Sequence, residues 1–258
     1  MFQNLSEREK QTLDLLMEEE GISVTEIGKR LSVSTVTVRS VLNSLSDKGV
    51  ILRTWGGASP AFHPEILERQ KRHQETKAKI AEAAAAMVSD GDAVMVEAGT
   101  TTSMIGRYLF GRRDLHVVTN SMLFLAYGRA NPALGVTVVG GSFQAVTESL
   151  VGPIALRELE QFHARLAFVG TDGFSLKHGA TTHLVEGAEI VRKMAEHADE
   201  VVLLADSSKY GQTGFARVLE LSVFDCVISD SDLPENARYE LEEAGIKLKL
   251  VDIKAKEK

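Results

Sequence analysis

The chain has 258 residues, of which 44% are hydrophobic and 25% are charged, a composition that excludes a disordered or fibrous protein. Its longest apolar runs, such as residues 201–205, are far shorter than the roughly 20 residues of a membrane span. Its start carries no basic and apolar leader, and its single cysteine excludes an internal disulfide, so we expect a cytoplasmic protein without a membrane partner. The net charge of −7, averaged over the whole chain, argues against a nucleic-acid partner. No metal-ligand spacing and no nucleotide-binding fingerprint occurs, so we expect neither a metal nor a cofactor.

The first 58 residues predict three helices followed by two short strands. Ser6 and Glu9 form a capping box that starts a helix over residues 6–19, and a second helix is predicted over residues 25–31. After a tight turn, Ser34 is well placed to cap a third helix that runs to about residue 48. The apolar segment that follows predicts two strands of a wing. We therefore predict a winged helix-turn-helix domain over residues 1–58, whose third helix enters the major groove of DNA.

The outward face of the third helix carries the chemistry that reads DNA. Its apolar positions share one face, so hydroxyl, amide and guanidinium groups, which bind base edges and phosphates, point the other way. The residues that we predict to contact DNA are Ser34, Thr35, Val36, Thr37, Arg39, Ser40, Asn43 and Arg53. Residues 21–58 carry five basic and two acidic side chains, a local charge of +3 within an acidic chain. A helical module that uses this face to contact another protein is the alternative.

Residues 59–75 hold two of the five prolines and little apolar periodicity, and we predict a linker there. From residue 76 onward, apolar strands alternate with amphipathic helices, the pattern of a mostly parallel αβα sheet. The predicted strands cover residues 93–96, 115–119, 136–139, 166–169, 201–205, 226–229 and 247–251. The predicted helices cover residues 76–88, 101–110, 121–131, 151–162, 187–197 and 234–244. The predicted fold class is therefore α/β, with a second domain over residues 76–258.

Polar or glycine-rich segments follow five of the predicted strands. They begin at Glu97, Thr119, Gly140, Gly170 and Asp206. Because ligands bind beyond the carboxyl ends of parallel strands, we expect these segments to converge on one binding rim. Glycines and threonines at the start of a helix can hold a phosphate, although each segment alone is also a common cap or turn.

The head resembles the DeoR family of bacterial sugar-pathway transcription regulators. The resemblance rests on a Val-Ser-x-x-Thr-Val-Arg string on the third helix and a Leu-x-Arg-x-x-Gly-Gly-Ala wing. The matching residues are Val33, Ser34, Thr37, Val38, Arg39, Leu42, Leu52, Arg53, Gly56, Gly57 and Ala58. Where the family usually has a basic residue and an aspartate, this chain has Ser40 and Val41, which implies weaker phosphate contacts or a different operator.

The body resembles the sensor domain of the same family, which is similar in fold to ribose-5-phosphate isomerase. The strings that carry this resemblance lie at residues 97–102, 118–121, 139–142, 170–174 and 203–211. The resemblance implies a phosphorylated sugar as effector, with a phosphate cradle after the first strand, a hydroxyl-binding aspartate and a lysine as countercharge. The residues that would bind it are Glu97, Gly99, Thr100, Thr101, Thr102, Asn120, Ser121, Gly140, Gly141, Asp172 and Lys209. Glu97 replaces the usual aspartate and Val191 replaces a usual lysine, two departures that imply a different effector or lower affinity.

Together these features predict a transcription regulator, a repressor, of a carbohydrate-utilisation operon. It would bind double-stranded operator DNA as a homodimer or homotetramer, because half-sites mirror a protein two-fold, and it would not be an enzyme. The alternative is an isomerase-like enzyme with an accessory head, in which Glu97, Asp172, Glu186 and Lys209 act as acid, base and countercharge.

Overall fold

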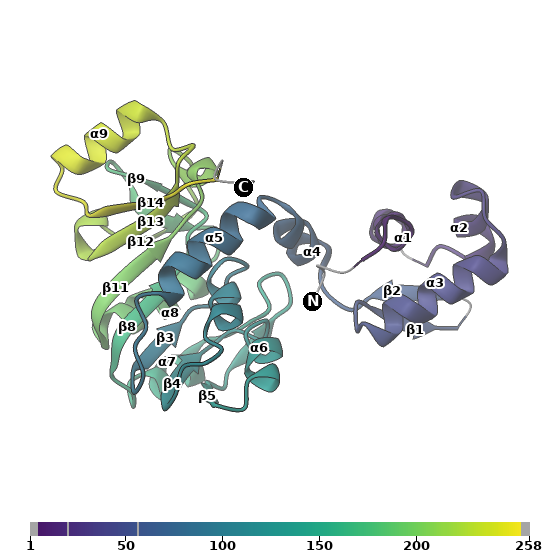
Figure 1. Cartoon of the computed structure of the whole chain (residues 1–258), viewed down its shortest axis with the longest axis horizontal. Coiled ribbons are helices and arrows are strands. Elements are labelled where there is room, and N and C mark those ends of the chain that lie inside the picture. Colours follow the sequence, from purple (N-terminus) through teal and green to yellow (C-terminus); the bar gives the residue numbers. More distant parts are fainter. Residues whose placement is uncertain (1–4, 20, 56, 254–258) are drawn as a thin grey trace. The chain divides into compact units, whose positions relative to one another are not determined.

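The computed structural model of the chain describes residues 5–19, 21–55 and 57–253 (Figure 1). The chain forms two compact units, Met1–Glu68 and Arg69–Lys258. The division between Glu68 and Arg69 falls inside the segment that we predict as a linker.

The N-terminal unit contains the three helices and the hairpin predicted from the sequence. α1 (Glu7–Glu18), α2 (Val24–Arg30) and α3 (Thr35–Asp47) are followed by the antiparallel strands β1 (Ile51–Thr54) and β2 (Gly57–Pro60). Each helix begins after a serine, Ser6, Ser23 or Ser34, whose side chain accepts a hydrogen bond from a backbone N–H of the first turn. The winged helix-turn-helix prediction is therefore confirmed.

Gly28 of α2 packs closely against the turn between α2 and α3. A Cβ at Gly28 would lie 2.9 Å from the carbonyl oxygen of Val33, so a larger residue would push the two helices apart. Below this turn, Leu13, Ile27 and Leu42 form a fully buried apolar core that keeps α3 in place.

A buried carboxylate also braces α1 against α3. Glu9, only 5% exposed, accepts hydrogen bonds from Ser44 Oγ (2.7 Å), Lys48 Nζ (2.6 Å) and the Ser6 backbone N–H (2.7 Å). Burial alone would raise the pKa of Glu9, but these donors outweigh it and hold the pKa at about 2. The carboxylate is therefore charged and fully engaged at neutral pH.

The predicted linker is not extended chain throughout. It contains the end of β2 and the helix α4 (Pro64–Lys71), in which Ile66 and Leu67 are buried. Leu67 packs into the apolar core of the N-terminal unit. The helix is short and mostly charged, so Ile66 and Leu67 alone do not produce a recognisable helical periodicity in the sequence. Proline at the first helical position, here Pro64, is a common signal for the start of a helix.

The C-terminal unit is built on a seven-stranded sheet in the order β14-β13-β11-β8-β3-β4-β5, in which every pairing is parallel. Each of the seven predicted strands is present and differs from its prediction by a few residues at most. Their bounds are β3 (Ala93–Val96), β4 (Leu115–Thr119), β5 (Leu134–Val138), β8 (Ala164–Val169), β11 (Ala198–Leu204), β13 (Cys226–Asp230) and β14 (Leu248–Val251).

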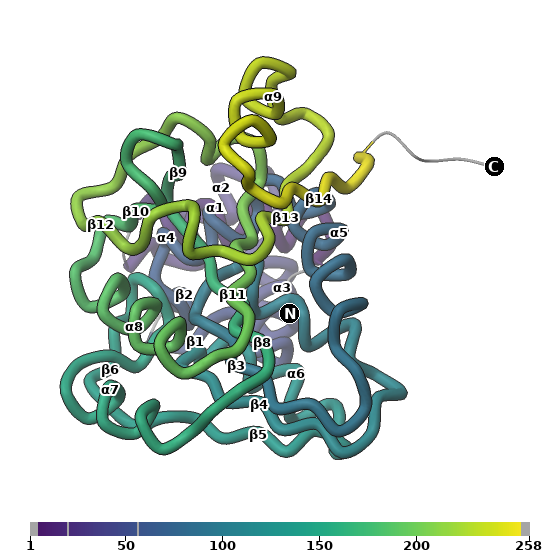
Figure 2. The backbone as a smooth tube through the Cα atoms, turned by 90° about the vertical axis from the view of Figure 1, so that its left-hand side faces the viewer, coloured from purple at the N-terminus to yellow at the C-terminus, as the bar shows by residue number. Residues whose placement is uncertain are grey.

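Helices cover both faces of this sheet, with α7 and α8 on one side and α5 on the other (Figure 2). The strands alternate accordingly: Val94 and Val96 of β3 lie in the core with α5, whereas Met95 lies in the core with α8. The αβα prediction is therefore confirmed. The helices are α5 (Gln74–Ala85), α6 (Leu125–Ala130), α7 (Pro153–Leu159), α8 (Val185–Glu196) and α9 (Glu235–Glu243).

Several short elements were not predicted. The hairpin of β6 (Ser142–Gln144) and β7 (Ser149–Val151) and the antiparallel sheet of β9 (Gly173–Ser175), β10 (Gly179–Thr182) and β12 (Ala216–Leu219) consist of strands too short to show an alternating pattern. The remaining short elements are the 3-10 turns η2 (Ser207–Lys209) and η3 (Leu221–Val223).

One predicted helix has a different form. The segment predicted as a helix over residues 101–110 is the 3-10 helix η1 (Thr102–Tyr108), whose period of three cannot be told from 3.6 over so few residues. Among the residues that the structure describes, no helix is long and apolar enough to cross a membrane.

Candidate functional site

The outward face of α3 is open to solvent. Ser34, Thr35, Arg39, Ser40 and Asn43 are exposed, and the isopropyl group of Val36 is 73% exposed. Thr37 is half-buried, and its backbone N–H (3.1 Å) and its hydroxyl (2.9 Å) both contact Ser34 Oγ at the start of the helix. The hydroxyl of Ser34 therefore caps α3 and is bonded to the hydroxyl of Thr37, while the side chains of the other predicted residues have no hydrogen bond to any described residue.

The wing carries further exposed side chains of the N-terminal unit. Arg53 is exposed on β1, as predicted, and Gly56 lies outside the described residues. The indole of Trp55, which we did not assign a role, is fully exposed beside it, and Leu52 is 62% exposed. An exposed tryptophan beside an arginine is a common feature of binding surfaces. The available signal in the sequence was the position of Trp55 between the two predicted strands of the wing.

In the C-terminal unit, the loops after β3 and β4 are bonded to each other at the carboxyl edge of the sheet. The Ala98 N–H donates to Asn120 Oδ1 (2.9 Å), Asn120 Nδ2 donates to the Leu150 carbonyl (3.2 Å), and Ser103 and Ser121 share a hydrogen bond of 2.9 Å. Asn120 and Ser121 are buried, so their polar groups brace the rim from inside. The two residues are brought together as expected, with their side chains already engaged.

The loop after β3 turns back on itself. The hydroxyl of Thr102 donates to the Glu97 carbonyl (2.7 Å) and Ser103 Oγ donates to the Gly99 carbonyl (2.6 Å). A Cβ at Gly99 would lie 2.8 Å from Thr102 Oγ1, so a larger residue would displace this hydroxyl from its hydrogen bond to the Glu97 carbonyl. The side chain of Thr101 is half-buried and has no hydrogen bond to any described residue, which leaves its hydroxyl available to a ligand.

The Gly140–Gly141 turn has a mainly structural explanation. The Gly140 N–H donates to the carboxylate of Glu158 on α7, and a Cβ at Gly141 (φ +141°) would lie 2.5 Å from the Val151 carbonyl oxygen. The glycines thus allow β5 to pass into the β6–β7 hairpin. Val191, the position of a lysine in the family pattern, is buried in the apolar core with α8 and offers no polar group.

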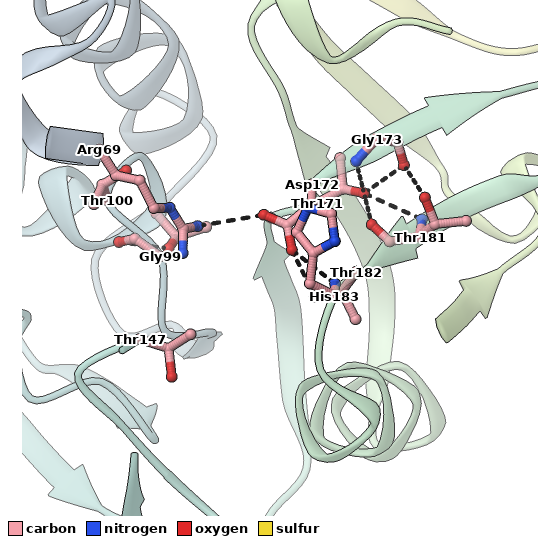
Figure 3. Close-up of polar contacts among 12 residues, drawn as sticks. Arg69, Gly99, Thr100, Thr147, Thr171, Asp172, Gly173, Thr181, Thr182 and His183 are labelled. Atoms are coloured by element: carbon pink, nitrogen blue, oxygen red, sulfur yellow. Dashed lines mark hydrogen bonds and ion pairs between the residues drawn. The ribbon is translucent and has the colours of Figure 1, made fainter. Parts of the chain in front are cut away.

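Asp172, after β8, is the most heavily engaged acidic group of the rim (Figure 3). Its Oδ2 accepts hydrogen bonds from Thr182 Oγ1 (2.9 Å) and the His183 N–H (3.0 Å), and its Oδ1 lies 3.6 Å from Arg69 Nη2. Burial opposes its charge, but Arg69 and the two hydrogen bonds outweigh burial and hold the pKa of Asp172 below its usual range. Arg69 was not predicted, because it lies in the segment taken as a linker.

Glu97, one strand away, has the opposite electrostatics. It accepts one hydrogen bond, from the Gly170 N–H to Oε2 (3.1 Å), and burial raises its pKa to about 8. The carboxyl group is therefore protonated at neutral pH and can donate a hydrogen bond as well as accept one.

Lys77 on α5 is a second residue that sequence reasoning missed. It is 6% exposed, and its ammonium donates to Thr100 Oγ1 (3.2 Å) and to the Arg69 carbonyl. Burial lowers its pKa to about 8. The available signal was its place three and four residues before Ile80 and Ala81, on the buried face of the predicted helix.

Lys209, at the end of η2, is half-buried, and its ammonium has no hydrogen bond or ion pair with any described residue. It acts electrostatically on Lys77 and, like Arg69, lowers the pKa of that lysine. The rim therefore combines the cations Arg69, Lys77 and Lys209 with the neutral carboxyl group of Glu97 and with Asp172, which pairs with Arg69. Among the described residues, no group of three or more histidine, cysteine, aspartate or glutamate side chains could hold a metal ion.

Comparison with known protein families gives a match over most of the chain. Residues 8–61 match the family described as the DeoR-like helix-turn-helix domain, and residues 72–231 match the DeoR C-terminal sensor domain.

Individual relatives are similar over nearly their whole length. The chain is 34% identical over 233 residues to the transcriptional repressor GlcR of Bacillus subtilis, covering 89% of each chain. It is 32% identical to the transcriptional regulator GlpR of Haloferax volcanii, over 93% of this chain and 96% of that one. It is 27% identical to a putative aga operon transcriptional repressor of Escherichia coli, over 95% and 94%.

Solved structures give a weaker likeness. Ribose 5-phosphate isomerase A of Methanocaldococcus jannaschii matches 53% of this chain and 54% of its own, at 16% identity and a TM-score of 0.39. A likeness of that size supports no argument about activity.

Proposed function

The chain belongs to the DeoR family of transcription regulators, and from this premise we propose that it represses a carbohydrate-utilisation operon. In this proposal α3 and the wing bind double-stranded operator DNA. A phosphorylated sugar at the carboxyl edge of the large sheet releases it.

The observation that carries the DNA-binding proposal is the open face of α3. Arg39, Ser40 and Asn43 are exposed on a helix whose opposite face is held by a complete apolar core. These side chains donate and accept hydrogen bonds of the kind that read the major groove, and residues 21–58 carry a charge of +3 that attracts phosphates.

The effector proposal rests on the charges of the rim. The chain has a net charge of −7, yet Lys77 and Lys209 at the rim form no ion pair with any described residue. A phosphorylated sugar supplies an anion for these cations and hydroxyls for Glu97, Thr101 and Asp172.

Arg69 suggests how the effector acts on the DNA-binding unit. α4 contributes Leu67 to the core of the N-terminal unit, and its Arg69 is held by Asp172 in the rim (Figure 3). An effector that engages Asp172 competes for this ion pair. The effector can shift the equilibrium only if it binds the two resulting states with different affinity. We propose a homodimer or homotetramer in the cytoplasm as the working unit, because operator half-sites mirror a protein two-fold.

Gel retardation of the DNA upstream of the gene's own operon tests the DNA-binding proposal. The full chain should retard this DNA specifically at low salt, and Arg39→Ala should weaken binding by about tenfold to a hundredfold. Arg113→Ala, which removes an exposed arginine of the C-terminal unit, is the matched control and should leave binding unchanged. Absence of specific retardation, or no effect of Arg39→Ala, contradicts the proposal and favours a protein-contact module.

The isomerase alternative is not favoured, since the matching family and the named relatives are regulators. Incubation with pentose and hexose phosphates should show binding without turnover. Isomerase activity that disappears in Lys209→Ala would reverse this ranking.

A further inference from the structure

α5 carries a charged residue on its buried face. Ile80, Ala81 and Ala84 pack against the sheet, and Lys77 lies one turn before them with only 6% of its surface exposed. Burial of an ammonium group is costly unless a carboxylate or another anion compensates it. The surroundings of Lys77 therefore indicate whether its role is structural.

Its contacts are neutral. The ammonium donates to the hydroxyl of Thr100 and to the carbonyl of Arg69, which uses two of its three N–H donors. Among the described residues, no carboxylate lies within 4.0 Å of Lys77 Nζ. Asp206 is near enough to favour the charged form, but its Oδ1 already accepts hydrogen bonds from the N–H and the hydroxyl of Ser208.

Other cations make this deficit larger. Lys209, Arg69 and Arg72 each act on Lys77 as like charges and lower its pKa. Lys209 is itself without an ion pair in the described part of the chain. Asp206 attracts the buried ammonium of Lys77 from a distance, but no carboxylate of the described residues is in contact with it and one of its donors is unused, unlike a lysine in a direct structural pair. Glu9 and Lys48 in the N-terminal unit show such a pair, at 2.6 Å.

We infer that Lys77, with Thr100 and Lys209, forms the subsite that binds the phosphate group of a phosphomonoester. Two ammonium groups match the nearly two negative charges that such a group carries at neutral pH, and Thr100 adds a hydroxyl. Gly99 and Thr100 lie beside Arg69, with Asp172 on the opposite side (Figure 3). The phosphate end of the ligand therefore lies at α5 and the hydroxyl-bearing end at Asp172.

This assignment rests on the proposed function, since the phosphate belongs to the proposed effector. It adds Lys77, a helix residue, to the loop residues of the proposed site, and it assigns the phosphate end and the hydroxyl-bearing end of the ligand to different parts of the rim. It also has a signature in pH. The free protein has a Lys77 pKa of about 8, and a bound dianion favours the charged ammonium and raises that pKa. At pH 8 about half of the free Lys77 is uncharged, so binding takes up about half a proton per site, whereas at pH 6.5 the lysine is already charged and takes up none.

The test compares the full-length wild type with Lys77→Met, which keeps an unbranched side chain only one atom shorter and removes the charge. The probes are inorganic phosphate, followed by thermal shift against chloride at equal ionic strength, and a set of pentose and hexose phosphates, followed by calorimetry. We expect Lys77→Met to lose at least about tenfold in affinity for the phosphates. Lys177→Gln, which removes an exposed lysine, should bind as the wild type does.

Stability separates a binding role from a structural one. Without phosphate, Lys77→Met should melt at the wild-type temperature or above it, because removal of an unpaired buried charge does not destabilise the fold. If the variant does not fold, calorimetry of the wild type at pH 8 in two buffers of different ionisation enthalpy decides, and absence of proton uptake overturns the assignment.

The outcomes for the two proposals differ. If the wild type binds none of the phosphates, the proposed effector is wrong and the subsite falls with it. If the wild type binds them and Lys77→Met binds them equally well, the subsite alone is wrong.

Discussion

Two glutamates, the buried Glu9 of the N-terminal unit and the half-buried Glu97 of the C-terminal unit, have opposite electrostatics. Glu9 accepts hydrogen bonds from a lysine, a serine hydroxyl and a backbone N–H, and its pKa is about 2. Glu97 accepts a single backbone N–H, and its pKa is about 8. The lysines follow the same division, since Lys48 pairs with Glu9 while Lys77 has no carboxylate partner among the described residues.

The difference separates structural charges from charges kept for a ligand. The buried carboxylate of the N-terminal unit is compensated within the protein, and the exposed cations of α3 and the wing remain for a large polyanion. In the C-terminal unit, the ammonium groups of Lys77 and Lys209 have no carboxylate partner among the described residues, while Asp172 is paired and the carboxyl group of Glu97 is neutral. In the proposed function, a small anionic ligand supplies the charge that the two lysines lack.

The largest effect is expected at the compensated site. Glu9→Gln removes the charge that Lys48, Ser44 and Ser6 compensate, and should destabilise the N-terminal unit by about 2 kcal/mol at pH 7. Because the folded-state pKa of Glu9 lies below its unfolded value, this stability is present above about pH 4.5 and is lost as pH falls toward 2. Urea unfolding of both proteins at pH 7 and pH 3 measures it. A constant difference between them at the two pH values would contradict the assigned pKa.

Glu97→Gln should act in the opposite direction, by about 1.5 kcal/mol. Because the folded-state pKa of Glu97 lies above its unfolded value, the wild type loses stability as pH rises from about 4.5 to 8. The variant should therefore be more stable than the wild type at pH 9 and equal to it at pH 4, as measured by thermal unfolding. A less stable variant at pH 9 would show that Glu97 is compensated like Glu9.

Lys209→Ala and Thr101→Ala test the rim as a ligand site. Each removes a group that has no side-chain partner among the described residues, so folding and DNA retardation should be unchanged, while affinity for the phosphorylated sugar falls by about tenfold for the lysine and less for the threonine. Loss of DNA binding in the same variants would indicate misfolding, and unchanged sugar-phosphate affinity would exclude these residues from the site.

Arg69→Ala should have the smallest effect. The substitution breaks the ion pair with Asp172, which the effector is proposed to replace. The affinity of the effector-free protein for the operator should therefore shift by about 1 kcal/mol toward the affinity of the effector-bound protein. Arg69→Lys, which keeps the charge, is the control. Identical operator affinity and identical effector response in Arg69→Ala and wild type would exclude the ion pair from the coupling.

The larger elements of the fold could be predicted because each has a long enough pattern. The seven parallel strands are apolar runs between amphipathic helices, and the caps at Ser6 and Ser34 are local signals. The three-residue strands β6, β7 and β9 are too short to show such a pattern, and they pair with β7, β6 and β10 in small sheets separate from the large one.

The candidate site was predictable only where its residues follow strands. Loop residues such as Thr101, Asp172 and Lys209 lie on the rim because strand ends of a parallel sheet meet there. Lys77 and Arg69 reach the same rim from helices, and Arg69 comes from a segment without apolar period. Their positions depend on how α4 and α5 pack, which spacing along the chain does not specify.

The most direct test of the account is a titration of phosphorylated sugars into the full chain bound to labelled operator DNA, followed by fluorescence anisotropy. At least one pentose or hexose phosphate should release the DNA from the wild type. The same sugar without its phosphate should not, and Lys209→Ala should require about tenfold more of the effective compound. Specific DNA binding that no phosphorylated sugar changes would contradict the central claim that the rim controls the operator.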